Sequence, residues 1–174
     1  MNKGFFFLFF FLFFLSFILK GQSEFPNTNN QNKENNLLLS PFYDTITFLD
    51  LSKKKLKEVP KEVLLMKSLE KLIIKQNYIK EIPKELSLLK NLHYLDLSSN
   101  YIETLPKELS LLNIDTLIMW DNKIKSFYKE FSLWGNTLLY LDMRAIQMNR
   151  KQQKSIKALF PNAKIRMAYP CNCN

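Results

Sequence analysis

An apolar pattern that returns about every 23 residues constrains this 174-residue chain more than any other feature. From Ile46 onward the unit reads L-x-x-L-x-L-x-x-N-x-L-x-x-L-P-x-x-L-x-x-L-x-x. The clearest copies are Leu69 to Asn91 and Leu92 to Asn113, with less regular copies at Ile46 to Ser68 and Ile114 to Thr137. A fifth copy begins at Leu138 and then departs from the pattern. Such periodicity is typical of a solenoid, in which each unit buries its apolar face against its neighbours.

The start of each copy, L-x-x-L-x-L, has the alternation of a short β-strand. One face of that strand is apolar, and a single unit is too small to cover it. Stacking the strands in parallel would bury two columns of side chains. We expect the first to be Leu49, Leu72, Leu95, Leu117 and Leu141, and the second to be Leu51, Ile74, Leu97, Met119 and Met143.

Asparagine occupies the position where the chain turns out of the strand, at Asn77, Asn100 and Asn122. A side-chain amide both donates and accepts hydrogen bonds, so it can satisfy backbone groups that such a turn leaves unpaired. Lys54 and Ile146 stand at this position in the first and fifth copies. These departures are expected at the two ends of a repeat array.

Proline followed by Lys-Glu recurs in the second half of the unit, at Pro60, Pro83 and Pro106. Proline is tolerated in the first turn of a helix, and a nearby glutamate favours the positive helix end. We therefore expect short helical or 3-10 turns there. Tyr128 replaces proline in the fourth copy, which predicts a looser turn, and Trp134 takes a leucine position, which places it in the core.

These motifs closely resemble the bacterial leucine-rich-repeat family of the 23-residue LPxxL type, from about Leu37 to the C-terminus. The resemblance implies an α/β solenoid: a horseshoe segment with a parallel concave β-sheet, short convex helical or 3-10 turns, and a C-terminal helix-strand cap. We assign residues 37–45 to an N-terminal cap, 46–149 to about five repeats, and 150–174 to a C-terminal cap with a cysteine-containing tail. A helix is expected over Gln152 to Phe160 and a last strand over Ala163 to Met167.

The first 23 residues have the layout of a signal peptide. A short basic start is followed by the apolar run Phe5 to Leu19, and Gly21-Gln22-Ser23 offers small residues for cleavage after Ser23. The competing interpretation is an uncleaved N-terminal anchor, since Lys20 is a poor residue near a cleavage site. Both interpretations predict export, to a secreted, periplasmic or cell-surface location. The Asn-rich stretch 24–36 is expected to be a flexible linker.

The sequence contains few residues of the kinds that catalysis and metal binding require. Glycine occurs three times and histidine once, at His93, while the two cysteines are Cys171 and Cys173. A phosphate-binding glycine loop and a multi-ligand metal site are therefore not expected. We predict no enzymatic activity and no cofactor. The cysteines either pair with each other or form intermolecular disulfides.

Side chains that point away from the core of the predicted sheet are the candidate binding residues, because the family binds ligands on its concave face. A patch of aromatic and aliphatic side chains bordered by charges is typical of a protein-recognition site. An alternative is that the aspartates follow the family's common L-D-L pattern and that the aromatic rings support the sheet by cross-strand packing. The candidate partner-contact residues are Tyr94, Ile118, Trp120, Tyr140, Lys75, Asp96, Asp142 and Arg144.

The chain is basic, with a formal net charge of +9. Basic clusters lie at Lys53 to Lys57 and Arg150 to Lys154. The leading prediction is a non-enzymatic, exported module that binds a protein through its concave face. The alternative is a surface-associated protein that binds anionic envelope polymers, glycans or membrane through its basic residues. Nucleic acid is not an expected partner, and membrane association is expected only if the leader is retained.

Overall fold

The computed structural model describes residues 43–171. The chain divides into two units, Met1–Leu38 and Leu39–Asn174. The predicted leader, the predicted linker and residues 37–42 of the predicted N-terminal cap lie outside the described residues. The repeats and the C-terminal cap all belong to the second unit.

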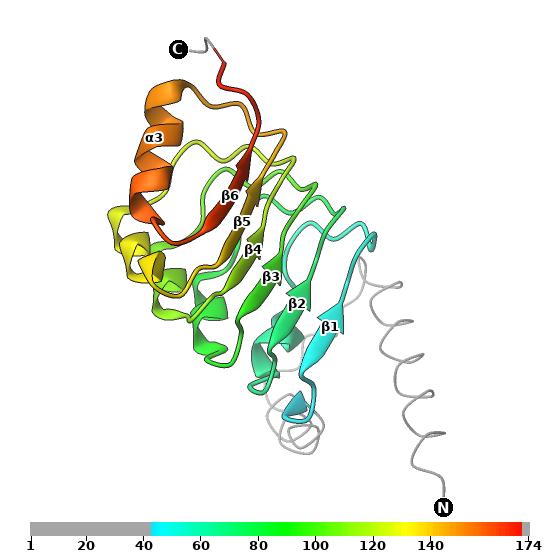
Figure 1. The fold of residues 1–174 in the computed structure, drawn as a ribbon. Helices are drawn as coiled ribbons and strands as arrows, with labels where there is room; N and C mark the ends of the chain where they lie inside the picture. Colours follow the sequence, from blue (N-terminus) through cyan, green and yellow to red (C-terminus); the bar gives the residue numbers. More distant parts are fainter. Residues whose placement is uncertain (1–42, 172–174) are drawn as a thin grey trace, which may run out of the picture. The chain divides into compact units, whose positions relative to one another are not determined.

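Six parallel strands form one open sheet in sequence order, as Figure 1 shows. The strands are β1 (Phe48–Asp50), β2 (Lys71–Ile73), β3 (Tyr94–Asp96), β4 (Thr116–Ile118), β5 (Tyr140–Met143) and β6 (Lys164–Met167). Equivalent residues of neighbouring copies are paired, for example Leu72 with Leu95 and Leu95 with Leu117. The repeat period therefore sets the strand register directly.

Both predicted columns of apolar side chains are buried. The middle residues of β1 to β5 are aligned in register, and all ten side chains of the two columns are at most 7% exposed. Burying a side chain of this size contributes about 1.5–3 kcal/mol. The core thus lies between the sheet and the segments that connect each strand to the next.

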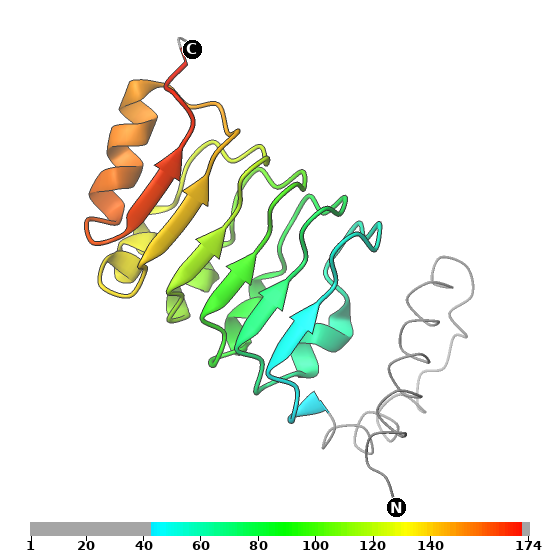
Figure 2. The same ribbon diagram turned by 45° about the vertical axis from the view of Figure 1, so that its right-hand side comes forward.

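Residues 43–171 contain four 3-10 helices, which lie on the side opposite the sheet (Figures 1 and 2). They are η1 (Lys61–Leu65), η2 (Lys84–Leu88), η3 (Lys107–Leu111) and η4 (Lys129–Gly135). The first three begin directly after Pro60, Pro83 and Pro106, as the sequence predicts.

The prediction of a looser turn at Tyr128 is wrong. Tyr128 has φ −66° and ψ 151°, close to the values of the prolines, and η4 is the longest 3-10 helix at seven residues. Aromatic packing holds this turn, because the rings of Phe131 and Trp134 are buried with their centroids 4.7 Å apart. The indole Nε1 of Trp134 also donates to the Leu112 carbonyl at 2.9 Å. Trp134 is in the core, as its repeat position predicts.

The repeat asparagines form a hydrogen-bonded ladder through the interior. Asn100 Nδ2 donates to the carbonyl of Leu97 in its own turn and to that of Ile74 in the preceding repeat, at 2.9 and 3.1 Å. Asn100 Oδ1 accepts from the Ile79 amide at 3.1 Å. Asn77 and Asn122 bind equivalent groups one repeat to either side. Each amide therefore fixes its own turn and joins it to the preceding repeat.

The C-terminal cap consists of α3 (Arg150–Leu159) and β6. The helix begins two residues before the predicted Gln152 because Asn149 and Gln152 form a reciprocal capping box. Ile156 and Phe160 are buried against the last repeat. Phe160 lies 5.5 Å from Phe127 and 6.5 Å from Trp134 between ring centroids, so the cap packs on the aromatic fourth copy.

We expect Asn100→Ala to lower the free energy of unfolding by about 2–3 kcal/mol. The substitution leaves the buried Ile79 amide unpaired, which costs about 1–3 kcal/mol, and it removes one of the two asparagine donors from each of the Ile74 and Leu97 carbonyls. Asn91→Ala is the matched control, since Asn91 makes one exposed hydrogen bond to the Lys67 carbonyl, and a loss of at most about 1 kcal/mol is expected. Urea unfolding measures both, and equal losses would contradict a structural role for the ladder.

Candidate partner-binding face

The outward side chains of the six strands form three rows, which together we call the sheet face. The register places one row along Phe48, Lys71, Tyr94, Thr116, Tyr140 and Lys164. The same pairings place a second row along Asp50, Ile73, Asp96, Ile118, Asp142 and Arg166. Backbone hydrogen bonds beyond the strand ends continue the alignment through Lys75, Ser98, Trp120 and Arg144.

The apolar members of the predicted patch lie on three neighbouring strands or directly after them. Tyr94 and Tyr140 flank Thr116 in one row, and Ile118 lies between Asp96 and Asp142 in the next. Tyr94, Ile118, Trp120 and Tyr140 are all half-buried. Burial raises the pKa of the Tyr94 hydroxyl, and the nearby Asp96 and Tyr140 raise it further. The structure therefore brings these four side chains into one surface region, with Trp120 partly covered.

Asp142 and Arg144 bind each other at the C-terminal side of this region. The Arg144 guanidinium donates to both carboxylate oxygens, with Nη2 2.7 Å from Oδ2 and Nε 2.9 Å from Oδ1. Burial alone would raise the pKa of Asp142, but these bonds, the Arg144 amide and the charges of Arg144 and Arg166 outweigh burial and lower it. The Tyr140 hydroxyl also donates to Asp142, at 3.4 Å.

The other aspartates of the second row also have hydrogen-bond donors within the chain. Asp96 is 6% exposed and accepts from the backbone amide and hydroxyl of Ser98. Asp50 accepts in the same way from Ser52. Burial would raise the pKa of Asp50, while the Ser52 bonds and the charges of Lys75 and Lys54 lower it overall. Lys75 thus acts electrostatically on Asp50, in the first repeat.

Three sheet-face cations were not among the predicted contact residues. Lys71 Nζ lies 4.1 Å from the centroid of the Tyr94 ring and 5.6 Å from that of Phe48, both within cation–π range. Lys164 and Arg166 of β6 extend the first and second rows beyond Tyr140 and Asp142. The alternation of apolar and polar side chains in Ala163 to Met167 predicts β6. Pairing this segment with Tyr140 to Met143 would have placed Lys164 and Arg166 on the sheet face.

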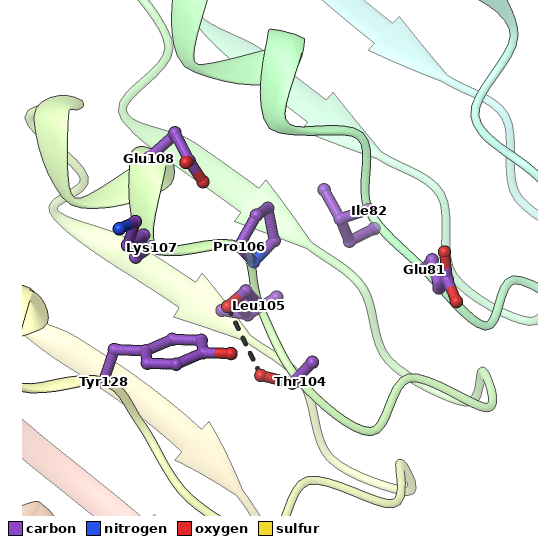
Figure 3. A pocket seen from close by; sticks show the side chains of 8 residues that line it. All are labelled: Glu81, Ile82, Thr104, Leu105, Pro106, Lys107, Glu108 and Tyr128. Carbon is purple, nitrogen blue, oxygen red and sulfur yellow. Dashed lines mark hydrogen bonds between the residues drawn. The ribbon is translucent and has the colours of Figure 1, made fainter.

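A hollow of about 460 Å³ lies away from the sheet face, where the chain enters η2, η3 and η4 (Figure 3). Figure 3 shows the Tyr128 ring lying beside Thr104 and Leu105. None of the predicted contact residues lines this hollow. Its lining residues are Glu81, Ile82, Thr104, Leu105, Pro106, Lys107, Glu108 and Tyr128.

The remaining chemically distinctive residues in the range 43–171 are His93 and Cys171. His93 is exposed, and its Nδ1 lies 3.0 Å from Asp115 Oδ2. Cys171 is disulfide-bonded, and Cys173 lies outside the described residues. No group of three or more metal-binding side chains is found in this range, and no helix within it is long and apolar enough to span a bilayer.

Comparison with known proteins supports the repeat architecture. Residues 44–102 and 67–124 match the family model described as Leucine rich repeat. A leucine-rich-repeat protein of Leptospira interrogans is 30% identical with a TM-score of 0.68, and the match covers 82% of this chain and 34% of that protein. No curated protein matches the sequence.

Two other solved structures share the fold. Internalin C2 of Listeria monocytogenes is 24% identical, with a TM-score of 0.61, and the match covers 74% of this chain and 54% of that protein. TLR13, solved in complex with a single-stranded RNA, is 26% identical with a TM-score of 0.56, and the match covers 70% of this chain and 18% of TLR13. The chain therefore spans about a third of the Leptospira protein and less of TLR13. It is a leucine-rich-repeat protein.

The Asp142 pair predicts a specific pH dependence. A carboxyl whose folded-state pKa lies below its ordinary value of 3.8 contributes stability that is present above the unfolded-state pKa and lost as the pH falls through the folded-state pKa. The difference in unfolding free energy between the wild type and Asp142→Asn should therefore be constant above about pH 5 and shrink below about pH 4.

Urea unfolding from pH 7 to pH 3 measures this difference. Arg144→Gln removes the guanidinium that lowers the pKa of Asp142, so the stability of this variant should fall less steeply below about pH 4 than that of the wild type. A difference between the wild type and Asp142→Asn that does not change with pH would contradict the assignment.

Proposed function

We propose that this chain is a non-enzymatic, exported binding module that recognises a protein partner through its sheet face. The observation that carries the proposal is the cluster of Tyr94, Ile118, Trp120 and Tyr140, half-buried on adjacent strands. Stacked repeats commonly use such extended surfaces for binding. Tyrosine and tryptophan are also enriched among the residues that dominate protein interfaces.

The hydrogen bonding around the cluster supports a preformed site. Side chains that are already held in place lose less conformational entropy on binding, so more of the contact energy appears as affinity. Asp142 and Arg144 hold each other, and Asp96 is bound by Ser98. We therefore assign these charged residues a positioning role beside the apolar contacts, with the exposed Arg144 at the rim.

A crosslinking experiment tests which face meets the partner. A photoreactive amino acid at Thr116, between Tyr94 and Tyr140, should crosslink one protein from an extracellular or host-surface extract, while the same group at the exposed Leu111 of η3 should not. Adding Tyr94→Ala and Trp120→Ala should abolish the Thr116 crosslink without unfolding the chain.

Tyr101→Ala is the matched control, since Tyr101 is an exposed aromatic residue outside the sheet face. Crosslinks that persist in the double variant, or that are equally strong from Leu111, would refute the proposed binding face.

Export to a secreted, periplasmic or cell-surface location is proposed from the leader sequence. If signal peptidase acts after Ser23, the mature chain begins at Glu24. N-terminal sequencing of the protein recovered from cell fractions tests this directly. An intact leader in the membrane fraction would favour the anchor, whereas an intact chain in the cytoplasm would refute export.

The alternative function, attachment to an anionic surface through basic residues, is favoured by a separate observation. The excess of positive charge outside the leader is concentrated at the C-terminal end of the repeat array. A concave-face protein complex should respond modestly to salt, whereas binding through this charge should weaken steeply.

A further inference from the structure

The net charge of the chain is distributed very unevenly along the sequence. From Glu24 to Asp142 there are 16 basic and 16 acidic residues, so this part has no net charge. After Asp142 there are seven basic residues and no acidic residue. The whole excess of positive charge outside the leader therefore belongs to the C-terminal end of the array.

The structure gathers these seven cations on the elements that close the solenoid, and all seven are exposed. We call this set the basic cap. Figure 1 shows α3 and β6 together at the C-terminal end of the sheet. The helix directs Ile156 and Gln153 into the core, so its four cations occupy the solvent side. The basic cap consists of Arg144, Arg150, Lys151, Lys154, Lys157, Lys164 and Arg166.

Almost none of this charge is neutralised within the described residues. Arg144 pairs with Asp142, and Arg166 lies close enough to act on the same carboxylate. The other ion pairs of residues 43–171 join His93 to Asp115 and Lys125 to Glu103. Since no acidic side chain follows Asp142, the basic cap produces a positive potential that an anionic partner would neutralise.

The exposed cations of the basic cap favour an extended partner over a ligand held in a pocket. Four of them lie on the solvent side of α3, Lys164 and Arg166 lie on the sheet face, and the hollow of Figure 3 lies elsewhere, between Glu81 and Tyr128. Tyr169, which directly follows the cap strand, is 97% exposed. Tyrosine is enriched where apolar and aqueous phases meet at a membrane surface. Within α3 no aromatic side chain is interleaved with the cations, as base stacking by a nucleic-acid site would require.

We propose that the basic cap docks on the surface of an anionic lipid bilayer. Clusters of four to eight basic residues on a helix are attracted to anionic headgroups, and each charge near the surface strengthens binding about fivefold. The predicted leader would bring the chain to a membrane, whether or not it is later removed. The four cations of α3 lie outside the aromatic cluster, and Arg144 is the one residue that the basic cap shares with the predicted contact residues, so the proposal does not depend on the proposed protein partner.

Lysine footprinting of the full chain tests the proposal. The chain is acetylated in the presence of vesicles of phosphatidylcholine, either alone or with about one third phosphatidylglycerol, and the labelling of each lysine is measured by mass spectrometry. Anionic vesicles should slow labelling of Lys151, Lys154 and Lys157 several-fold relative to neutral vesicles, and salt should abolish the effect.

Lys61, Lys84 and Lys107 are internal controls in the same molecule, because they are exposed lysines at the starts of η1, η2 and η3. Their labelling should not depend on the lipid charge. Equal labelling of the cap lysines with both vesicle types, or equal protection of both lysine sets by anionic vesicles, would overturn the proposal.

A pair of charge-matched variants separates the basic cap from net charge. Lys151→Gln/Lys154→Gln/Lys157→Gln and Lys61→Gln/Lys84→Gln/Lys107→Gln each remove three positive charges, and circular dichroism establishes that both are folded. A vesicle titration that follows protection of Lys164 should show affinity for anionic vesicles falling roughly 100-fold in the cap variant. The control variant should stay within a few-fold of the wild type, and equal losses would overturn the proposal.

Two competing polyanions complete the experiment, since TLR13 has been solved with single-stranded RNA. The same footprint is recorded with single-stranded RNA and with sulfated dextran in place of vesicles. Bilayer docking predicts that anionic vesicles protect the cap at charge concentrations where the soluble polymers do not. Protection by RNA or dextran at lower charge concentrations than vesicles would overturn the proposal in favour of a linear polyanion.

Discussion

The amide of the repeat asparagine is the interaction on which the structure depends. Asn100 binds the carbonyl of Leu97 in its own turn and that of Ile74 in the preceding turn, and it accepts from the Ile79 amide. One side chain thus shapes the turn that ends a strand and fixes the spacing to the neighbouring repeat. Because the strands are then aligned residue by residue, the sheet face consists of continuous rows of side chains.

The ladder of hydrogen bonds ends at the fifth copy, which has no asparagine at the repeat position. In the fifth copy Ile146 occupies the asparagine position, and it is buried without the polar groups that would reach a following turn. Ala145 keeps the left-handed backbone of the corresponding turns, with φ 58°, so the last turn retains its shape while the repeat stops. The chain then forms α3 and β6, and these closing elements carry the excess positive charge. The end of the repeat pattern and the change in charge therefore coincide.

Folding also changes what the sheet face can present to a partner. The sequence offers Lys75, Asp96, Asp142 and Arg144 as a charged border, yet Asp96 and Asp142 are 6% and 2% exposed. Their lone pairs are occupied by Ser98 and Arg144. Removing a buried, hydrogen-bonded carboxylate from these partners would cost free energy, so the aspartates hold the surface in place. The aromatic and aliphatic side chains between them are what remains available for contact.

The sequence by itself determined the strands, the two buried columns and the 3-10 turns, because a 23-residue period leaves one way to bury the two columns of strand side chains. It also indicated the cap elements, through helical spacing and then alternation of their apolar residues. It did not determine the backbone conformation at Tyr128. That turn is held by the packing of Phe131 against Trp134, a side-chain contact that the repeat period does not predict. Only the tertiary structure placed Lys164 and Arg166 beside Tyr140 and Asp142, because β6 lies outside the repeat and its register is set by pairing. Burial of the aspartates and exposure of the seven cap cations were likewise decided by folding, since both depend on which neighbours cover each side chain.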